Sequence, residues 1–478
     1  MDEDLMLKWG IAEAREALAS GKVTSEQLTK AHLDQARGLN GALNAFVEIY
    51  AESAMEEAKS SDARRAAGKT LGALDGIPIA IKDNILVRGR AACGGSNILR
   101  GHIAASDSTV ATKLKAAGVV FIGRTNMDEF AMGSSTERSA FGPTKHPRDQ
   151  ERVPGGSSGG SAVAVAADMC VAALGSDTGG SIRQPASFCG IVGLKPTYGR
   201  VSRSGLMALA SSLDQIGPMT KTVEDAALLL EVIQGADPMD QTTSDEPAFK
   251  PAWRKDLKGL RIGLPRQAWG EGMSKGVREQ VTAAIEVLKT QGASVSEVDL
   301  PFADEALAVY YVLMPCEVSA NLARFDGMRF GQRAKDLPLT ETYLRSRAEG
   351  FGPEARRRIL LGTFALSRGY YDAYYLQAKR VQSLIRQGYE AAFRDVDILL
   401  MPTAPTTAFK LGEKTTDPLA MYLEDIFTVG VNVAGLPAVS VPCGQDAGLP
   451  VGLQLIGKHF DEATVLATAR VYEQASKP

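Results

Sequence analysis

Two short clusters of glycine and serine stand on either side of one apolar stretch. Residues 155–161 read Gly-Gly-Ser-Ser-Gly-Gly-Ser, and residues 175–181 read Gly-Ser-Asp-Thr-Gly-Gly-Ser. Such clusters are usually flexible loops. These two adjoin dense hydrophobic runs, so we interpret their glycines as positions that need unusual backbone angles or a close approach inside the core. A serine hydroxyl held in such a loop is a candidate nucleophile.

A serine nucleophile needs a base, and histidine is a poor candidate for that role here. Residues 155–159 match the G-x-S-x-G pattern of a nucleophile elbow, which requires a histidine later in the chain. Only His459 follows the serine, in an unremarkable setting. Surface or structural roles suit all four histidines, which are His32, His102, His146 and His459.

Lys82 is a different candidate base. It follows the β-branched run 77–81, so it lies at the end of an expected buried strand. Burial lowers the pKa of a lysine from ~10.4 towards ~7, and a neutral amine accepts a proton. A lysine at a strand end is more often a solvated charge or an ion-pair partner, and Asp83 could supply that pairing.

These residues together resemble the amidase signature family. The resemblance rests on the two Gly/Ser clusters, on Ile79 to Asn84 and on Ser212 to Pro218, and Lys82, Ser157 and Ser181 follow in the family's order. It implies an α/β fold with a central mixed β-sheet covered by helices on both faces. It also implies that Ser181 is the nucleophile, that Ser157 is a proton bridge preceded by a cis peptide bond, and that Lys82 is the base.

The resemblance assigns further roles around the nucleophile. The backbone N–H groups of Thr178, Gly179 and Gly180 are expected to face the oxyanion of a tetrahedral intermediate. Asp177 and Arg183 are expected to support the loop by hydrogen bonds, and a surface ion pair is the alternative for them. His146 departs from the family, where we expect Asn, and this affects the local loop rather than the catalytic residues.

The C-terminal half resembles the branch of the family whose members hydrolyse glutamine within tRNA-dependent amidotransferases. The similar segments are 319–331, 351–359 and 417–425. The resemblance implies that Tyr310, Arg358 and Asp425 bind glutamine, and the first two assignments could shift by one residue within their Tyr-Tyr and Arg-Arg-Arg runs. A guanidinium pairs with an α-carboxylate and a carboxylate with an α-ammonium.

The same resemblance implies partners. It implies a heterotrimer in which a kinase-like partner binds misacylated tRNA and holds ATP and magnesium, together with a small third protein. Ammonia would pass to the tRNA-binding partner, while this chain itself would hold no cofactor and no metal. The acceptor stays open between Glu-tRNA(Gln), Asp-tRNA(Asn) and both. The alternatives are a stand-alone amidase acting on small aliphatic or aryl amides and a non-enzymatic binding scaffold.

The pattern of elements agrees with a layered α/β protein. We expect one domain over residues 1–478, with a helical segment 1–70, a core 71–230, a helical insertion 305–395 and returning strands in 396–478. Thr24 and Gln27 predict a helix start. Helices are expected at 110–117 and around 277–288, and strands at 77–82, 119–122, 295–300, 398–401, 438–441 and 451–456. The tyrosines 370, 371, 374 and 375 form a helical stripe that we assign to packing.

Composition restricts the binding partners and the cellular compartment that we expect for this chain. The 478 residues are 45% hydrophobic and 23% charged, with a net charge of −3, so the chain has no basic excess with which to hold nucleic acid alone. The acidic start 1–4 does not look like an export signal. The best membrane candidate, 162–174, is short and contains Asp168, so we read it as buried helix and strand. Five dispersed cysteines disfavour a disulfide framework or a zinc site, and we expect a cytoplasmic protein without membrane contact.

Overall fold

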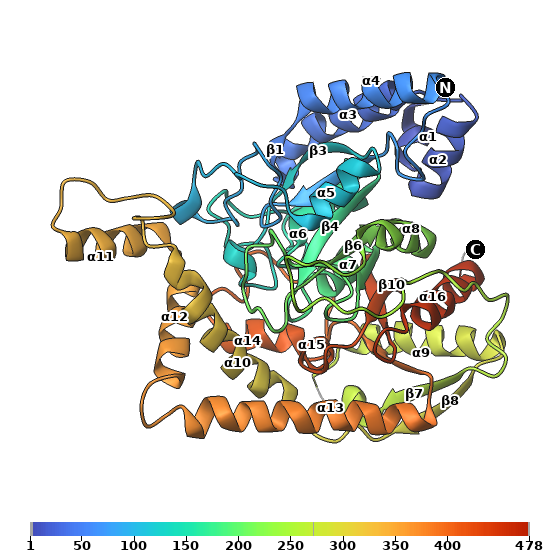
Figure 1. The fold of residues 1–478 in the computed structure, drawn as a ribbon. Helices are drawn as coiled ribbons and strands as arrows, with labels where there is room; N and C mark the ends of the chain where they lie inside the picture. The colour runs from blue at the N-terminus through green and yellow to red at the C-terminus, as the bar shows by residue number, and fades with distance from the viewer. Residues whose placement is uncertain (1–2, 271, 477–478) are drawn as a thin grey trace.

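A computed structural model describes residues 3–270 and 272–476, and Met1 and Asp2 of the acidic start lie outside the described residues. Its centre is a mixed sheet of eleven strands in the order β1-β3-β2-β4-β6-β5-β10-β11-β9-β7-β8 (Figure 1). The strands are β1 (Phe46–Ile49), β2 (Pro78–Lys82), β3 (Val120–Thr125), β4 (Ala172–Asp177), β5 (Val192–Lys195), β6 (Gln215–Thr220), β7 (Arg261–Pro265), β8 (Ser294–Val298), β9 (Ile398–Pro402), β10 (Ala438–Asp446) and β11 (Leu449–Ile456). Strand β2 is parallel to β3 and β4, and β7 is parallel to β8 and β9, while the other pairs are antiparallel.

Helices cover both faces of the sheet (Figure 1). They are α1 (Glu3–Leu7), α2 (Ile11–Ala19), α3 (Ser25–Leu43), α4 (Ala51–Ala66), α5 (Thr109–Ala116), α6 (Gly159–Ala166), α7 (Arg183–Cys189), α8 (Val223–Ile233), α9 (Lys275–Thr290), α10 (Ala306–Asn321), α11 (Leu339–Gly350), α12 (Pro353–Ala365), α13 (Gln377–Asp395), α14 (Pro418–Tyr422), α15 (Val429–Ala434) and α16 (Glu462–Ser476). Short 3-10 turns lie at Asn97–Leu99, Glu129–Ala131, Arg266–Trp269, Leu322–Arg324 and Leu423–Asp425, and a π-helical turn, η5, at Asp372–Leu376.

The alternation of side chains along β2 shows how the two faces form. Ile79 and Ile81 belong to the core shared with α5, α8, α9 and α16, whereas Ala80 belongs to the opposite core with α6. Successive strand residues point to opposite faces, so a strand buried on both sides is apolar throughout. This confirms the expected α/β fold with a covered mixed sheet.

Most expected elements are confirmed. Thr24 and Gln27 form the reciprocal cap at the start of α3. Strands occur at each of the six predicted places, and the membrane candidate 162–174 is the end of α6 and the start of β4, buried throughout apart from residues 166–167. The first seventy residues are not helical throughout, because Asn44 ends α3 in a left-handed conformation and Phe46 starts β1, which pairs with β3.

Two features of the helical insertion differ from expectation. Tyr370, Tyr371 and Tyr374 are exposed, so the packing predicted for the tyrosine stripe is confirmed only for Tyr375, which is partly buried against the core. Within the described residues, the stretch Ala306–Arg324 is long and apolar enough to cross a membrane, and more than half of it is buried. Its apolar composition matches its packing against α12, α13 and α15.

Candidate active site

Two neighbouring parallel strands bring the catalytic candidates to one edge of the sheet. Lys82 is the last residue of β2, and Asp177 is the last residue of β4, which pairs with β2 in parallel. Ser157 lies just before α6, and Ser181 lies just before α7. Carboxyl ends of parallel strands form the usual site edge of α/β sheets. The sequence-distant residues are therefore positioned by one sheet edge and two helix starts.

Lys82 is fully buried among serines. Its Nζ lies 2.8 Å from Ser157 Oγ, 2.7 Å from Ser158 Oγ and 3.0 Å from Ser176 Oγ. Burial lowers the pKa of Lys82 to about 7, although the charges of Asp128, Asp177 and Asp214 oppose that shift. Asp83 pairs with Arg124 instead, so the alternative of a Lys82–Asp83 ion pair is not what the structure shows. A lysine with this pKa is partly neutral near pH 7 and can accept a proton.

The surrounding hydroxyls orient the amine. The Ser158 hydroxyl donates to the carbonyl oxygen of Ser176 at 3.2 Å, so its oxygen is left to accept an N–H of Lys82. Ser176 Oγ accepts from Asn84 Nδ2 at 2.9 Å and from Lys82. A neutral amine has two N–H groups and one lone pair. When the neutral amine donates both N–H groups to Ser158 and Ser176, its lone pair is left to accept from the Ser157 hydroxyl.

Ser158 and Ser176 are site residues that sequence reasoning missed. They stand inside the two Gly/Ser clusters, next to Ser157 and Asp177, and nothing in their type or spacing separates them from the other serines. Their role depends on how two loops fold against Lys82, which only the three-dimensional arrangement shows.

Crowding explains the glycine before Ser157. A Cβ at Gly156 would lie 2.2 Å from Asp128 Oδ2 and 2.6 Å from the backbone nitrogen of Ser135. The peptide bond between Gly156 and Ser157 is cis, as the resemblance implied. The N–H of Gly156 donates to Gln184 Oε1 at 2.9 Å, which ties this loop to α7.

Ser181 is only 8% exposed, and its hydroxyl makes no hydrogen bond within residues 3–270 and 272–476. Its carbonyl oxygen accepts the N–H of Ser158 at 3.2 Å, so the two Gly/Ser loops are joined beside the nucleophile. The structure thus brings Lys82 and Ser157 into direct contact and leaves the Ser181 hydroxyl unengaged.

The predicted oxyanion donors divide into two kinds. The N–H of Gly180 donates to Asp177 Oδ1 at 2.8 Å, so it is directed at that carboxylate and not at an incoming oxyanion. This corrects the expectation for Gly180. The backbone N–H groups of Thr178 and Gly179 have no acceptor in the part of the chain that the structure describes. They are the donors that remain for a ligand.

Asp177 and Arg183 form a bidentate ion pair beneath residues 178–181, which we call the nucleophile loop because they contain the candidate nucleophile Ser181. Arg183 Nε and Nη2 each lie 3.0 Å from an oxygen of Asp177, and neither side chain is exposed, which excludes the surface alternative. Burial alone would raise the pKa of Asp177, but the charge of Arg183 lowers it. Asn432 and Gln454, from the C-terminal part of the chain, also bond to this pair.

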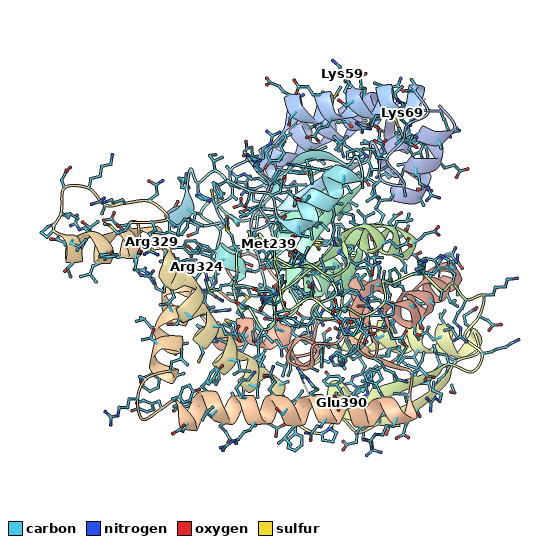
Figure 2. The ribbon with its side chains drawn as sticks, viewed as in Figure 1. Lys59, Lys69, Met239, Arg324, Arg329 and Glu390 are labelled. Atoms are coloured by element: carbon cyan, nitrogen blue, oxygen red, sulfur yellow. The ribbon has the colours of Figure 1, made fainter. Side chains whose placement is uncertain are left out.

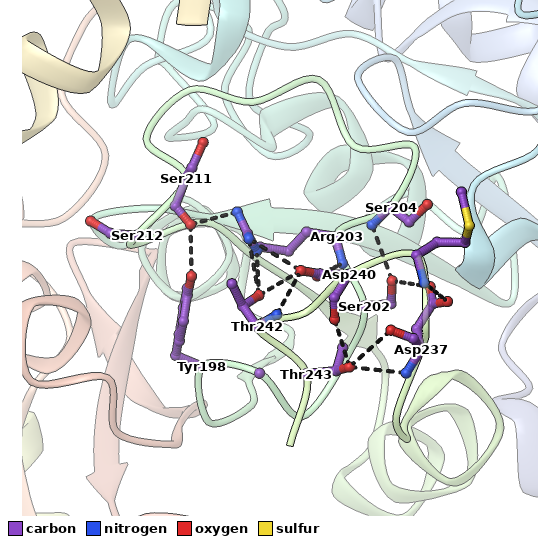
Figure 3. Close-up of polar contacts among 12 residues, drawn as sticks. Tyr198, Ser202, Arg203, Ser204, Ser211, Ser212, Asp237, Asp240, Thr242 and Thr243 are labelled. Carbon is purple, nitrogen blue, oxygen red and sulfur yellow. Dashed lines mark hydrogen bonds and ion pairs between the residues drawn. The ribbon is translucent and has the colours of Figure 1, made fainter. Parts of the chain in front are cut away.

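A second support reaches Thr178 through the loop 202–214. Thr178 Oγ1 donates to Asp214 Oδ1 at 2.6 Å, and burial raises the pKa of Asp214 to about 6. Arg203 holds the loop in place by bonding both to the carbonyl of Ser211 and to Asp240, and Tyr198 donates to the same carbonyl at 2.8 Å (Figure 3). The conformation of the nucleophile loop is therefore fixed from two sides.

Asp425 is buried close to the nucleophile loop. Both its oxygens accept from Ser134 Oγ, at 2.9 and 2.8 Å, and Tyr311 donates to it at 3.2 Å. Burial raises the pKa of Asp425 to about 7, although these hydrogen bonds and the charge of Arg358 oppose that shift. The carbonyl of Asp425 accepts from Thr428, which also bonds to the Gly179 carbonyl at 2.6 Å and so links the two regions.

Arg358 is buried beside Tyr311 and Tyr422. Glu354 Oε1 accepts from Arg358 Nε at 2.8 Å and from the Tyr422 hydroxyl at 2.8 Å. The guanidinium carbon lies 5.4 Å from the centre of the Tyr311 ring and 5.3 Å from that of Tyr422. Burial alone would raise the pKa of Glu354, but Arg358 and Arg138 lower it to about 2.

These contacts close a ring. Tyr311 bonds to Asp425 and stacks on Tyr422 with ring centres 3.9 Å apart, and Tyr422 bonds to Glu354, which holds Arg358. Tyr311 and Tyr422 thereby hold the Asp425 carboxyl and the Arg358 guanidinium near each other. Glu354, Tyr422 and Ser134 carried no signal in the sequence, because each becomes meaningful only through a partner far along the chain.

Both tyrosines of the uncertain pair lie at the site. A Cβ on Gly179 would lie 2.7 Å from the Tyr310 hydroxyl, so Tyr310 covers the nucleophile loop while Tyr311 reaches Asp425.

His146 is buried and has a structural role in its own loop. Its Nε2 lies 2.9 Å from the Phe188 carbonyl, and its Nδ1 accepts the N–H of Arg148 at 3.2 Å, a donor and an acceptor such as Asn also provides.

Known proteins are similar to this chain in sequence and in fold. The family model described as Amidase matches residues 27–466. The chain is 53% identical to the A subunit of glutamyl-tRNA(Gln) amidotransferase from Moorella thermoacetica over 467 residues, which is 97% of this chain and 96% of that protein. The crystal structure of the same amidotransferase component from Thermotoga maritima is 43% identical, with a TM-score of 0.82 over 99% of this chain and 96% of that one.

The fold extends to amidases of other kinds. Native peptide amidase from Stenotrophomonas maltophilia is 30% identical, with a TM-score of 0.83 over 97% of this chain and 96% of that chain. The family match, the full-length relatives and the shared fold agree with one another. The chain belongs to the amidase family.

Proposed function

We propose that this chain is the glutamine-hydrolysing component of a tRNA-dependent amidotransferase. The observation that carries the chemistry is the contact between Lys82, with a pKa near 7, and Ser157, in a loop bonded to that of Ser181. The proposed substrate rests on the similarity to glutamyl-tRNA(Gln) amidotransferase over nearly the whole chain and on the opposite charges of Arg358 and Asp425, which both lie beside Tyr311.

The proposed reaction starts at neutral Lys82. Lys82 takes the proton of Ser157, Ser157 takes the proton of Ser181, and Ser181 Oγ attacks the side-chain amide carbon of glutamine. The oxyanion accepts hydrogen bonds from the N–H groups of Thr178 and Gly179, and each such donor is worth ~10²–10³ in rate. The proton returns along the two hydroxyls to the leaving nitrogen, the C–N bond breaks, and ammonia departs. Water then cleaves the glutamyl ester on Ser181 by the same route and gives glutamate.

Arg358 and Asp425 would read the amino-acid end of glutamine. A guanidinium binds the α-carboxylate and a carboxylate binds the α-ammonium. The ammonium would also lower the pKa of Asp425 from about 7, so that the buried carboxyl is ionised in the complex. Tyr310 packs against Gly179 and would form the wall between the recognised end and the reacting amide.

The rest of the activity would belong to partner proteins. Ammonia would pass to a tRNA-binding partner that uses ATP and magnesium on the misacylated tRNA, within a cytoplasmic heterotrimer completed by a small third protein. No group of three or more His, Cys, Asp or Glu suited to a metal occurs in the described residues. The acceptor, Glu-tRNA(Gln) or Asp-tRNA(Asn), would be chosen by the tRNA-binding partner.

The test is Ser181→Ala in the reconstituted complex. We expect it to abolish glutaminase activity and glutamine-dependent amidation and to leave amidation with added ammonium salt, because the tRNA-binding partner needs only ammonia. Loss of both activities in a folded, assembled complex would contradict this division of labour. Peptide-amide hydrolysis that neither ATP nor aminoacyl-tRNA stimulates would favour a stand-alone amidase instead.

A further inference from the structure

Large apolar side chains gather on the outside of the helical insertion. Residues 322–388 hold twelve of the twenty large hydrophobic side chains that are exposed among the described residues. They are Met328, Phe330, Leu339, Tyr343, Leu344, Leu360, Leu361, Phe364, Tyr370, Tyr371, Tyr374 and Leu384. Exposed apolar side chains scattered singly are ordinary, whereas a concentration of them marks an interaction surface.

The centre of this surface is an aromatic cluster made of Phe364, Tyr370 and Tyr374. These rings are 43–48% exposed, and their centres lie 4.3 to 6.0 Å apart. They come from the end of α12, the turn after it and η5. A cluster of rings that pack on one another but not into the core is already ordered, so a partner that covers it loses little conformational entropy.

The same segment is basic in an otherwise acidic chain. Residues 322–388 contain 13 of the 53 Lys and Arg but only six of the 56 Asp and Glu, so their net charge is +7 in a protein of net charge −3. Arg368 lies in the turn that carries the aromatic cluster, and it is exposed and forms no ion pair with the described residues. Arg324 and Arg329 lie on this side of the molecule, far from Lys59 on α4 and from Lys69, which follows that helix (Figure 2).

Exposed leucines favour a protein partner over RNA at this surface. Basic residues with aromatic rings also suit RNA, but RNA-binding surfaces are polar and highly charged. Leu360 and Leu361, which lie one turn before Phe364 on α12, are 69% and 47% exposed and offer nothing to a phosphate or a base. Aromatic residues and Arg with an apolar centre are the composition of a protein–protein interface.

The surface is also close to the proposed chemistry. Helix α12 carries Glu354 and Arg358 on its buried face and Leu361 and Phe364 on its exposed face. Its buried face packs on α10, which carries Tyr310 and Tyr311. A protein seated on the outside of α12 would therefore lie one helix away from the glutamine site.

We infer that the aromatic cluster, with Leu360 and Leu361 beside it on α12 and Arg368 in its turn, is the docking site for a protein partner that presents an apolar patch within an acidic surface. Resting on the proposed function, we assign that partner as the tRNA-binding protein of the amidotransferase. Covering the cluster would bury apolar area, and the net positive charge of residues 322–388 would steer the acidic partner.

The experiment uses the full chain together with the recombinant tRNA-binding and small partner proteins from the same genome, purified as one partner complex. The two test variants are the double substitution Phe364→Ser with Tyr374→Ser, and the charge reversal Arg368→Glu. The matched controls are Leu71→Ser and Lys59→Glu, since Leu71 is 48% exposed and Lys59 lies on the N-terminal helix α4, away from the helical insertion (Figure 2). Hydrolysis of a simple ester and the melting temperature of each isolated chain verify that it is folded.

We expect the double variant to raise the Kd for the partner complex at least roughly tenfold at every salt concentration, because central aromatic residues dominate interfaces. Arg368→Glu should weaken binding mainly at low salt, where charge attraction is least screened. Both controls should bind like the unmodified chain. Glutamine-dependent amidation should fall with binding and recover at a high concentration of the partner complex.

Three results would overturn the assignment. If the assembly forms and both test variants bind as tightly as the controls, the surface serves another purpose, and the proposed function stands. If the variants instead abolish binding of misacylated tRNA to the isolated chain, or convert a self-associating chain to a monomer, the occupant is RNA or a second copy. If the unmodified chain neither binds the partner complex nor supports amidation with it, the proposed function itself fails.

Discussion

The chemistry of the site is decided at the scale of single residues by what surrounds Lys82. Among the residues that the structure describes, three serine hydroxyls and no carboxylate contact its amine, so burial dominates and the pKa falls to about 7. The charges of Asp128, Asp177 and Asp214 act from a distance and moderate the shift. A closer carboxylate would hold the lysine protonated and remove its use as a base.

Lys82→Arg tests this directly. Arginine keeps the positive charge but does not deprotonate at accessible pH, so a base role predicts a loss of turnover as large as that of Lys82→Ala. We would measure kcat for glutamine hydrolysis by both variants. Turnover close to that of the unmodified enzyme in Lys82→Arg would show a purely electrostatic role.

Glu354→Gln tests the ring that positions Arg358. Glu354 is 3% exposed and holds Arg358 through Nε, so loss of its charge leaves a buried guanidinium poorly paired. Disrupting such a pair costs ~2–5 kcal/mol, and we expect kcat/KM for glutamine to fall at least roughly tenfold, chiefly through KM. Hydrolysis of a simple ester, which has no α-carboxylate, should be unchanged.

The exposed Glu349→Gln on neighbouring α11 is the matched control and should leave both substrates unaffected. An equal loss on glutamine and on the simple ester in Glu354→Gln would mean that Glu354 supports the fold and not recognition.

At the scale of elements, close packing of helices positions the residues that we propose bind glutamine. A Cβ on Gly362 of α12 would lie 1.8 Å from the carbonyl oxygen of Pro315 in α10. The helices therefore meet through their backbones at this point. Tyr310 and Tyr311 on α10 and Arg358 on α12 take their separation from this contact.

Gly362→Ala should push the two helices apart. Overpacking of this kind costs ~1–3 kcal/mol, so we expect a lower melting temperature together with a raised KM for glutamine. Gly38→Ala in α3 is the control, because nothing lies within 4 Å of the added Cβ, and it should stabilise the protein by ~0.5–1 kcal/mol. A melting temperature for Gly362→Ala equal to that of the unmodified protein would contradict the contact.

The elements also show how far the sequence could lead. Strand β2 was predicted because its apolar run is continuous, and α3 because Thr24 and Gln27 cap it. Strand β1 was missed because Phe46 is buried only through pairing with β3 far along the chain. The family resemblance supplied Lys82, Ser157 and Ser181, whereas Ser158, Ser176 and Glu354 needed the folded arrangement.

At the scale of the whole molecule, buried lysines tie stability to pH. Burial lowers the pKa values of both Lys82 and Lys195 to about 7, from 10.5. Between pH 7 and 10.5 the unfolded chain binds more protons at these sites than the folded protein. Stability from these groups therefore rises with pH across this window, by up to about 1.4 kcal/mol per pH unit for each group.

Lys82→Met should remove one of these contributions. We expect the gain in unfolding free energy between pH 8 and pH 10, measured by urea denaturation, to be smaller in Lys82→Met than in the unmodified protein. The exposed Lys59→Met is the control and should keep the full gain. An identical gain in Lys82→Met would show that Lys82 is charged in the folded protein.

The late position of β10 and β11 in the chain has a consequence for synthesis on the ribosome. In the sheet, β10 and β11 lie between β5 on one side and β9, β7 and β8 on the other, so they connect its two parts. Asn432 and Gln454, which bond to the Asp177–Arg183 pair, belong to the same C-terminal segment. At ~5–20 residues per second, translation from Thr220 to Ile456 takes roughly 10–50 s. During that interval the nascent chain carries an unpaired sheet edge at β5 and an incompletely braced nucleophile loop. The protein is thus exposed to edge-to-edge aggregation while it is being made, and it acquires its amidase chemistry only as the last strands leave the ribosome.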